Sequence, residues 1–497
     1  MLCARGTCKD YFKNRGLSRI GTCPFPRLRY TGAGGEKETN TVWLAKLAVH
    51  RHTPSQGVTV QVLRLAWPVV VEQMLGTAVG LVNTYIVGHL GAAALAAVGL
   101  GSQLVNLLTA LFSAAGVGGT VLIARSIGAG EQREAETFAG QSLLLALALG
   151  ALMAVPCLFW GGEMLRALGG APDVVAPGRL YLLAVGTTMP LMALLFVGNA
   201  ALRGAGDTRT PMVIMAVVNG VNAVLSWGLV YGVGPLPALG VLGAGIGAAV
   251  GSAVGGVLVA RALLRGRAAG GLRVSRAGLR LDTERAWRLL RIGLPSGAEQ
   301  GLMRLAQVVM ASVVTGLGTA AYAGHQLGIQ LLSVAFTPGF AFSVAATTLV
   351  GQELGRQSPQ RAAACTMTAS WLALGVMCSG GVAAFFLAEP LVRFFTADPG
   401  VIAQGAIAVR GCAFIQPSLA WYFVLSGALR GAGDTGYVLL AQALPIWLVR
   451  LPLSWLLGIT AGLALPGIWA AMILDMSVRA LMLGLRFRSG AWQRIRV

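Results

Sequence analysis

A few ionisable side chains interrupt the long apolar segments of this sequence, and they are its best candidates for chemistry. Glu72 and Glu299 lie well inside two such segments. Charge at the centre of a bilayer is costly, so an acid there can serve as a proton or sodium site, or can bind a cation. The structural alternative is a protonated or ion-paired acid that packs the helix bundle. Gln300 directly follows Glu299 and is a candidate for the same site.

Four further residues belong to this group. Arg304 follows Glu299 by five positions, and a nearby positive charge changes the pKa of an acid. His325 carries an imidazole, which titrates in the physiological range, although a single buried histidine is more often a hydrogen-bonded core residue. Asp475 and Arg479 are four residues apart, the spacing that predicts a structural ion pair along one helix face.

The composition indicates that the apolar segments cross a membrane. Hydrophobic residues make up 56% of the chain and charged residues only 11%, whereas a soluble domain carries about a quarter charged residues. A helix needs roughly 20 apolar residues to cross a hydrocarbon core of about 30 Å. Runs of that length recur from Val58 almost to Val497. Because they are continuous rather than alternating, they favour helices over a barrel. The predicted fold is an all-α integral membrane protein.

The apolar runs predict twelve transmembrane helices and their orientation. The approximate ranges are 61–87, 94–123, 137–160, 178–202, 210–232, 241–264, 287–315, 321–350, 364–388, 402–428, 437–458 and 466–485. The net charge of +20 comes mainly from the loops and tails of one side, and the other side holds Arg166 and Arg393 as clear positive charges. Since positive loops mark the cytoplasmic face, both termini are expected to be cytoplasmic.

An internal repeat organises these helices. Leu-Arg-Gly-Ala-Gly-Asp-Thr occurs at 202–208 and again at 429–435, an offset of 429 − 202 = 227. The same offset relates Pro68 to Pro295, Glu72 to Glu299, Gln73 to Gln300, Gly91 to Gly318, Gln103 to Gln330, Pro172 to Pro399 and Pro190 to Pro417. An even number of spans separates the copies, so this is a parallel repeat of two six-helix lobes. Transporters built in this way bind cargo at the interface between repeats.

The repeat divides the chain into five parts. These are a basic, disordered cytoplasmic tail (1–57), an N-lobe (58–264), a cytoplasmic linker (265–285), a C-lobe (286–485) and a basic cytoplasmic tail (486–497). Pro68 and Pro295, at equivalent positions of the first helix of each lobe, are hinge candidates, because a proline inside a helix frees a carbonyl group and kinks the helix. A static kink is the alternative for each of them.

The repeated glycine motif predicts a tight turn rather than a nucleotide site. Its glycines allow the reversal, and Asp207 or Asp434 can cap the helix that follows. A phosphate-binding loop would need Gly-x-x-x-x-Gly-Lys-Ser/Thr, and the sequence does not contain that pattern. The seven cysteines form no Cys-x-x-Cys pair, so we predict neither a metal site nor a cofactor. An enzyme would also need clustered catalytic side chains. Transport would therefore draw on a proton or sodium gradient.

The region from Val58 to Arg494 resembles the multidrug and toxic compound extrusion (MATE) family. The stretches that carry the resemblance are Pro68 to Gly91, with its Asn83-Thr-Tyr-Ile-Val-Gly-His-Leu-Gly91, then Asn199 to Thr208, Pro295 to Gln300, Leu317 to His325 and Leu429 to Thr435. The resemblance implies two lobes with a cavity between them that opens alternately to each side. The implied activity is export of amphipathic, often cationic, compounds in exchange for protons or sodium.

The residues that match the family's polar positions lie in the N-lobe. Asn83 stands where family members often have an aspartate, Ser226 stands in place of a second aspartate, and Asn199 and Asn222 match polar positions. Neither expected carboxylate is present, so the usual N-lobe coupling site is replaced here by groups that cannot titrate. We therefore predict that Glu299, together with Glu72, supplies the coupling acid.

Two further functions remain open from the sequence. A flippase for a lipid-linked precursor would need several cationic side chains at depth to bind pyrophosphate, and apart from Arg304 the sequence offers Arg450 and Arg479. A receptor or structural role is the other alternative. The expected partners are a small cationic or amphipathic substrate and membrane lipid, without nucleic acid. The expected protein is a monomer in the plasma membrane, most simply a bacterial inner membrane.

Overall fold

The computed structural model describes residues 56–495, with gaps at 233–236, 267–270 and 275–276. These residues belong to a single compact unit, Pro54–Val497. The predicted N-terminal tail lies outside the described residues, except that the first helix already begins at Gln56. Every element assigned in the described part of the chain is a helix, which confirms the all-α fold class.

The N-lobe contains nine helical segments. They are α3 (Gln56–Gly88), α4 (Ala92–Thr109), α5 (Phe112–Ala129), α6 (Gln132–Phe159), α7 (Gly161–Ala167), α8 (Pro172–Thr187), α9 (Met189–Gly204), α10 (Arg209–Tyr231) and α11 (Val241–Arg265). Glycines in the left-handed region end three of them, with Gly130 after α5, Gly232 after α10 and Gly266 after α11. Each glycine accepts a positive φ without the steric cost of a side chain.

The C-lobe repeats this arrangement, with different interruptions. Its elements are η1 (Ala277–Leu279), α12 (Thr283–Thr315), α13 (Thr319–Gly355), α14 (Pro359–Phe386), α15 (Ala388–Arg393), α16 (Pro399–Gly431), α17 (Thr435–Pro445), η2 (Ile446–Arg450), α18 (Leu451–Trp455), η3 (Leu456–Thr460), α19 (Ala464–Arg488) and η4 (Ala491–Arg494). Asp282 caps α12 by accepting hydrogen bonds from the amides of Arg285 and Glu284. These bonds, chiefly the one from Arg285, hold the pKa of Asp282 below its usual value.

The number of spans follows from the repeat. Eleven described helices are long and apolar enough to cross a membrane, and α8 and α9, bent by 58°, form a further broken span. The eleven include α4 and α5 separately and do not include the less apolar α12. Adding 227 to the bounds of α4 and α5 gives the range of the single helix α13, and α8 and α9 correspond to α16 in the same way. α12 matches α3, its counterpart, with 33 residues each. Counted by repeat, the chain has the twelve predicted spans, six in each lobe.

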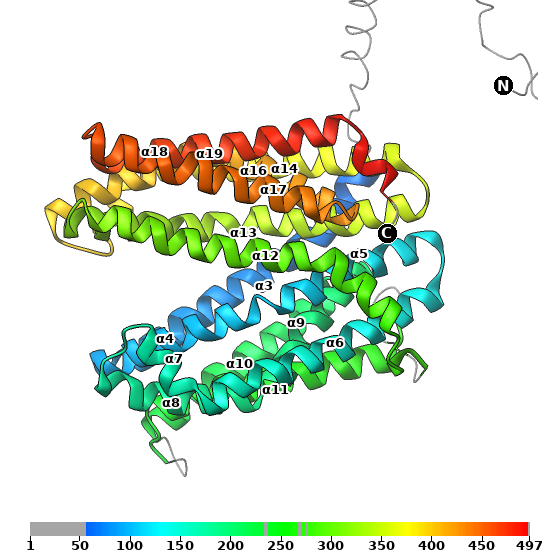
Figure 1. The fold of residues 1–497 in the computed structure, drawn as a ribbon, viewed down its shortest axis with the longest axis horizontal. Coiled ribbons are helices and arrows are strands. Elements are labelled where there is room, and N and C mark those ends of the chain that lie inside the picture. The colour runs from blue at the N-terminus through cyan, green and yellow to red at the C-terminus, as the bar shows by residue number, and fades with distance from the viewer. Residues whose placement is uncertain (1–55, 233–236, 267–270, 275–276, 496–497) are drawn as a thin grey trace, which may run out of the picture. The chain divides into compact units, whose positions relative to one another are not determined.

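The first helix of each lobe crosses to the other lobe. Val62 and Leu65, early in α3, pack in a core made mainly of C-lobe residues, whereas Ile86 and Val87 near its end pack on N-lobe residues of α10 and α11. α12 does the reverse, because Leu289 and Ile292 pack in an N-lobe core. Figure 1 shows α3 and α12 between the two groups of helices. The two lobes therefore exchange the beginnings of their first helices.

Backbone contacts between α5 and α13 join the lobes at one end of the molecule. We call it the basic end, because Arg125, Arg203, Arg356 and Arg486 lie there, at the ends of α5, α9, α13 and α19. A Cβ atom on Gly128 would overlap the carbonyl oxygen of Gln352, and one on Gly355 would overlap the carbonyl oxygen of Arg125. These two contacts are equivalent under the offset of 227, so the seam is symmetric.

The C-terminal segment also contacts the N-lobe at the basic end. Arg125 donates a hydrogen bond from Nη2 to the carbonyl oxygen of Ile495, at 2.9 Å. Trp492 is buried and stacks on Phe487, with ring centroids 5.0 Å apart. The helix α19 reaches Arg488, three residues beyond the predicted end of the C-lobe at 485. Part of the segment expected as a tail is thus packed structure.

Candidate functional site

Two buried ion pairs occupy equivalent positions in the two lobes. Arg203 on α9 donates to Glu72 on α3, with 3.0 Å between Nη1 and Oε1. Arg430 on α16 donates from Nη2 to both carboxylate oxygens of Glu299 on α12, at 2.6 and 2.9 Å. The glutamate side chains are only 8% and 6% exposed. Both glutamates and both arginines differ in number by 227, so the sequence repeat is also a repeat of contacts.

The repeated glycine motif positions both arginines. Arg203 and Arg430 lie in the last turn of α9 and α16, at the start of the tight turn. After that turn Asp207 accepts hydrogen bonds from the amides of Arg209 and Thr210, at 3.1 and 3.0 Å, which confirms the predicted cap. Asp434 instead accepts a hydrogen bond from Nε of Arg486, at 2.8 Å. The motif therefore supplies a paired arginine as well as a turn.

The structure corrects the partner predicted for Glu299. Arg304 is exposed and donates a hydrogen bond from Nη1 to Oε1 of Gln307, at 3.3 Å. Five residues along a helix correspond to about 140° of rotation, so Arg304 and Glu299 point to different sides of α12. The arginine that balances Glu299 is Arg430, which comes from another helix. Gln300, beside Glu299, is exposed as well.

A polar network connects Arg430 to other helices of the C-lobe. The hydroxyl of Tyr422 lies beside Arg430 and donates to Oε1 of Gln442. Nη1 of Arg479 donates to the same oxygen at 3.1 Å. Arg479 also pairs with both carboxylate oxygens of Asp475, at 3.0 and 2.6 Å, which confirms the predicted bridge. Asp475 and Arg479 are almost completely buried, so this network is internal to the lobe.

Among its described residues, the N-lobe has no equivalent of this network. Under the offset of 227, Tyr422 corresponds to Leu195 and Gln442 to Met215. Both are hydrophobic residues in or against the N-lobe core. The N-lobe therefore has apolar side chains at the two positions where the C-lobe has the hydrogen-bonding groups connected to its ion pair. The two lobes share the ion pair but differ in the polar groups connected to it.

His325 is a further candidate in the C-lobe, beside Trp469. It is buried in α13, its ring centroid is 5.7 Å from that of Trp469, and its Nδ1 has no hydrogen-bond partner among the described residues. Arg450 is within electrostatic range of His325 and Asp475. It lies in η2, a π-helical turn that directly follows Pro445. Such turns in a helix often mark functional sites.

The four N-lobe candidates are polar groups with open hydrogen-bonding capacity. Asn83 is half-buried on α3, Asn199 is buried on α9, and Asn222 and Ser226 are buried on α10. Oδ1 of each asparagine and Oγ of Ser226 have no hydrogen-bond partner in the described part of the chain. Asn219 on α10, which the sequence analysis did not single out, has an unpartnered Nδ2 in the same way. Buried polar groups usually find partners, so the unused hydrogen-bonding capacity keeps these residues as binding candidates.

Pro68 and Pro295 lie inside helices that continue through them. α3 runs unbroken from Gln56 to Gly88, and α12 from Thr283 to Thr315. Each proline lies four residues before the glutamate of its lobe. The carbonyl group that the proline ring leaves without a backbone donor belongs to the turn before the proline. Their role as hinges stays a prediction. No group of three or more potential metal-ligating side chains occurs among the residues that the structure describes.

Comparison with known proteins agrees with the repeat. The MatE family model matches residues 68–227 and 295–456, so the two matches begin 295 − 68 = 227 residues apart. The chain is 30% identical over 436 residues to a probable multidrug resistance protein NorM of Thermotoga maritima, covering 87% of this chain and 93% of the relative. It is 29% identical over 445 residues to the multidrug resistance protein PmpM of Pseudomonas aeruginosa, covering 88% and 92%.

Solved structures share the fold. One is an outward-facing multidrug resistance MATE family transporter, with a TM-score of 0.82 and 23% identity over 89% of this chain and 100% of that chain. A MOP superfamily transporter from Pyrococcus furiosus has a TM-score of 0.81 over the same shares, also at 23% identity. The family match and these relatives define a multi-pass membrane transporter rather than an enzyme, and the two-lobe fold agrees with that class. The chain belongs to the MATE family.

Proposed function

We propose that the protein is a secondary active antiporter that exports amphipathic or cationic organic compounds in exchange for protons or sodium. The main support is the geometry of α3 and α12. Their middle sections, around residues 76–85 and 304–309, are exposed at most positions, consecutive ones included. Consecutive residues of a helix point to different sides, so neither lobe covers these sections. The lobes meet at the basic end and leave the crossing helices accessible farther along.

This arrangement supports a mechanism of alternating access. The seam between α5 and α13 keeps the basic end closed, which we take to be the cytoplasmic end because of its arginines. Opening it would require the two lobes to rotate against each other, with α3 and α12 connecting them. Pro68 and Pro295 lie where these helices pass from one lobe toward the other. The protein would work as a monomer in the plasma membrane, with both termini cytoplasmic.

We assign ion coupling to Glu299 and Arg430. Binding a proton or sodium ion to the carboxylate removes the charge that balances Arg430, so the guanidinium must find another partner. Tyr422 and Gln442 lie on the same network and offer acceptor oxygens for it. A change at Glu299 can thereby reach α17 and α19. Glu72 and Arg203 lack that continuation, so Glu72 has a supporting role.

Substrate binding is assigned to the unpartnered N-lobe amides. Asn83, Asn199 and Asn222 can accept hydrogen bonds from a cargo molecule and, unlike carboxylates, do not fix its charge. Multidrug resistance is the activity named for the Thermotoga maritima and Pseudomonas aeruginosa relatives, which supports an organic cargo. A flippase is less well supported, because Arg203, Arg430 and Arg479 are all used in internal ion pairs and are not free to bind pyrophosphate.

Reconstitution in proteoliposomes tests the proposed function. A fluorescent organic cation is loaded, and an inward pH gradient or sodium gradient is imposed separately. We expect efflux that is driven by one of the two gradients and abolished by the matching ionophore. Efflux that is equal with and without both gradients would exclude an antiporter. Scrambling of a labelled lipid-linked pyrophosphate in the same vesicles would support the flippase instead.

A further inference from the structure

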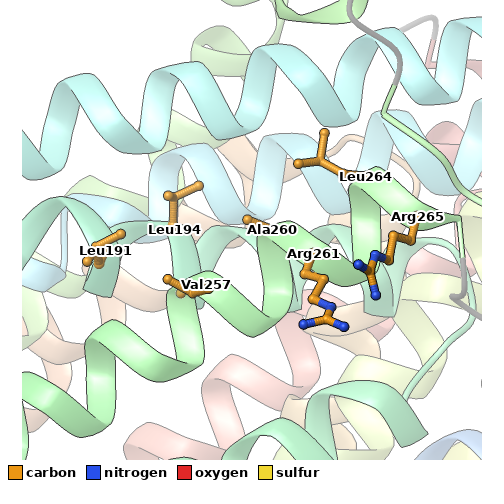
Figure 2. Close-up of a pocket in the computed structure, with 8 residues that line it drawn as sticks. Leu191, Leu194, Val257, Ala260, Arg261, Leu264 and Arg265 are labelled. Carbon is orange, nitrogen blue, oxygen red and sulfur yellow. The ribbon is translucent and has the colours of Figure 1, made fainter.

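A groove on the outside of the N-lobe combines an apolar wall with a basic end. It lies between α9 and α11, has a volume of about 310 Å³, and is lined by Leu191, Leu194, Gly256, Val257, Ala260, Arg261, Leu264 and Arg265. Figure 2 shows the leucines and Val257 along its length, with Arg261 and Arg265 extending from the same part of α11. Val257 is 55% exposed and Leu264 46%, so the groove opens to the lipid side.

The dimensions of the groove match one leaflet of a bilayer. Gly256 marks its inner end, because a Cβ atom there would overlap the carbonyl oxygen of Leu191 and the two helices touch at that point. From Gly256 to Arg265 the helix rises about 14 Å, roughly half of the 30 Å hydrocarbon core. Arg265 is the last residue of α11. It therefore lies near the boundary between acyl chains and headgroups, with Arg261 one turn deeper.

A third arginine is held beside this boundary. Leu272 and Val274 are buried in the N-lobe core with Leu263, and the amide of Val274 donates to the carbonyl oxygen of Leu263 at 2.9 Å. Arg273, between them, is exposed, and its side-chain carbons lie 3.2–3.5 Å from the Cβ position of Gly266. The linker thus returns to the end of α11 and fixes Arg273 next to Arg265.

The charge of the groove indicates what kind of molecule fits it. No acidic residue lines it, and Arg261, Arg265 and Arg273 have no ion pair or side-chain hydrogen bond in the described part of the chain. Three unpaired guanidinium groups repel a cationic cargo and attract a phosphate. The apolar wall below them suits acyl chains and offers nothing to a free anion. Basic pockets between membrane helices near a headgroup layer bind anionic lipid in the same way.

We propose that this groove binds an anionic phospholipid from the leaflet at the basic end. Its phosphate contacts Arg261 and Arg265, with Arg273 at the rim, and one acyl chain lies along Leu194, Val257 and Leu264. The site is separate from the polar residues assigned to cargo and coupling. Since α9 carries both Asn199 and Arg203, a bound lipid supports the helix that holds these groups.

Lipid retention by the purified full-length protein tests this proposal. Phosphatidylglycerol and phosphatidylcholine with identical acyl chains are added at equal concentration, and bound lipid is counted by native mass spectrometry. We expect wild type to retain phosphatidylglycerol preferentially. Arg261→Gln with Arg265→Gln should weaken that preference about fivefold per arginine, or about 30-fold for the pair. Arg488→Gln with Arg494→Gln removes the same charge from exposed positions at the same end of the other lobe, and should change little.

A second variant separates a groove from a diffuse electrostatic effect. Ala260→Trp fills the apolar wall and leaves every arginine in place, so we expect it to lose the retained lipid while its fold, measured by gel filtration, is unchanged. The proposal is overturned if wild type shows no preference, if the control pair weakens it as much as the groove pair, or if Ala260→Trp retains lipid like wild type. The proposal is also overturned if inorganic phosphate alone raises the thermal midpoint of the protein as much as phosphatidylglycerol does.

Discussion

At the scale of single residues, the C-lobe and N-lobe use the same ion pair in different surroundings. Arg430 connects Glu299 to Tyr422, Gln442 and Arg479, whereas Leu195 and Met215 take the equivalent positions in the N-lobe. An ion pair that is isolated in an apolar core can only stabilise or destabilise the fold. One that belongs to a network can pass a change of charge to other helices. This difference is why coupling is assigned to one pair of the two.

Neutralising Glu299 should uncouple the transporter. Glu299→Gln keeps the shape of the side chain but removes the negative charge, and we expect gradient-driven efflux to fall to background. Glu72→Gln is the matched control, because breaking either buried pair costs about 3–5 kcal/mol of stability. It should retain more than half of wild-type efflux. Both variants are compared for amount, thermal midpoint and efflux in proteoliposomes, and wild-type transport by Glu299→Gln would refute the assignment.

The sequence revealed the glutamate of each ion pair, but it pointed to the wrong partner for Glu299 and to none for Glu72. Glu72 and Glu299 stand out because acids are rare in apolar segments. Arg203 and Arg430 were equally visible, since they repeat at the same offset as the glutamates, but their position in a glycine turn suggested a structural role. Arg304 is close to Glu299 in sequence and therefore suggests itself as its partner. Five residues of helix, however, turn Arg304 to a different side of α12. Tyr422 and Gln442 have no polar counterpart in the repeat, so no pattern marked them.

At the scale of helices, the repeat predicted the spans but not their interruptions. α4 and α5 are separate where α13 is one helix, and α8 and α9 are bent by 58° where α16 is continuous. Proline does not explain the second difference, because Pro190 and Pro417 are equivalent and only the N-lobe helix is broken. The exchange of α3 and α12 was not predictable either, because an apolar helix face does not say which lobe covers it.

The crossing of α12 over α5 depends on one glycine from each helix, Gly118 on α5 and Gly293 on α12. A Cβ atom on Gly293 would overlap the carbonyl oxygen of Ala114, so Gly293→Ala should push the two helices apart and lower the stability of the protein by about 1–3 kcal/mol. Gly301, on the same helix, has no atom within 4 Å of its Cβ position. Gly301→Ala should be neutral or slightly stabilising. Thermal unfolding in detergent measures both, and equal midpoints would contradict the close packing described for Gly293.

At the scale of the whole molecule, the two lobes act as bodies that meet along the seam of α5 and α13. Gly128 and Gly355 make the same contact in opposite directions, each over the backbone of the other lobe. A seam of this kind holds through close packing and can separate without breaking a covalent or metal link. Under the proposed mechanism, the closed basic end is one position of the movement, and the small size of these two glycines lets the backbones meet there.

A bulky side chain in the seam should open the basic end. Gly128→Leu places a branched chain against the carbonyl of Gln352, and we expect the population to shift away from the closed arrangement. Distances between spin labels on exposed positions of α6 and α14 would measure the shift, with efflux reduced in parallel. Gly375→Leu, at a position with no atom within 4 Å of the Cβ, is the control. Unchanged label distances in Gly128→Leu would mean that the seam does not determine which end is closed.

The exchanged first helices have a consequence for the history of this architecture. Val62 and Leu289 stand at equivalent positions, and each is buried by helices encoded in the opposite half of the chain. A six-helix half made alone would leave that anchoring surface bare, whereas two copies could satisfy it reciprocally, as in a domain-swapped pair. Fusion of the two genes would then have preserved a helix exchange that was already present in a dimeric ancestor. Separately produced halves of this chain should accordingly find each other in the membrane.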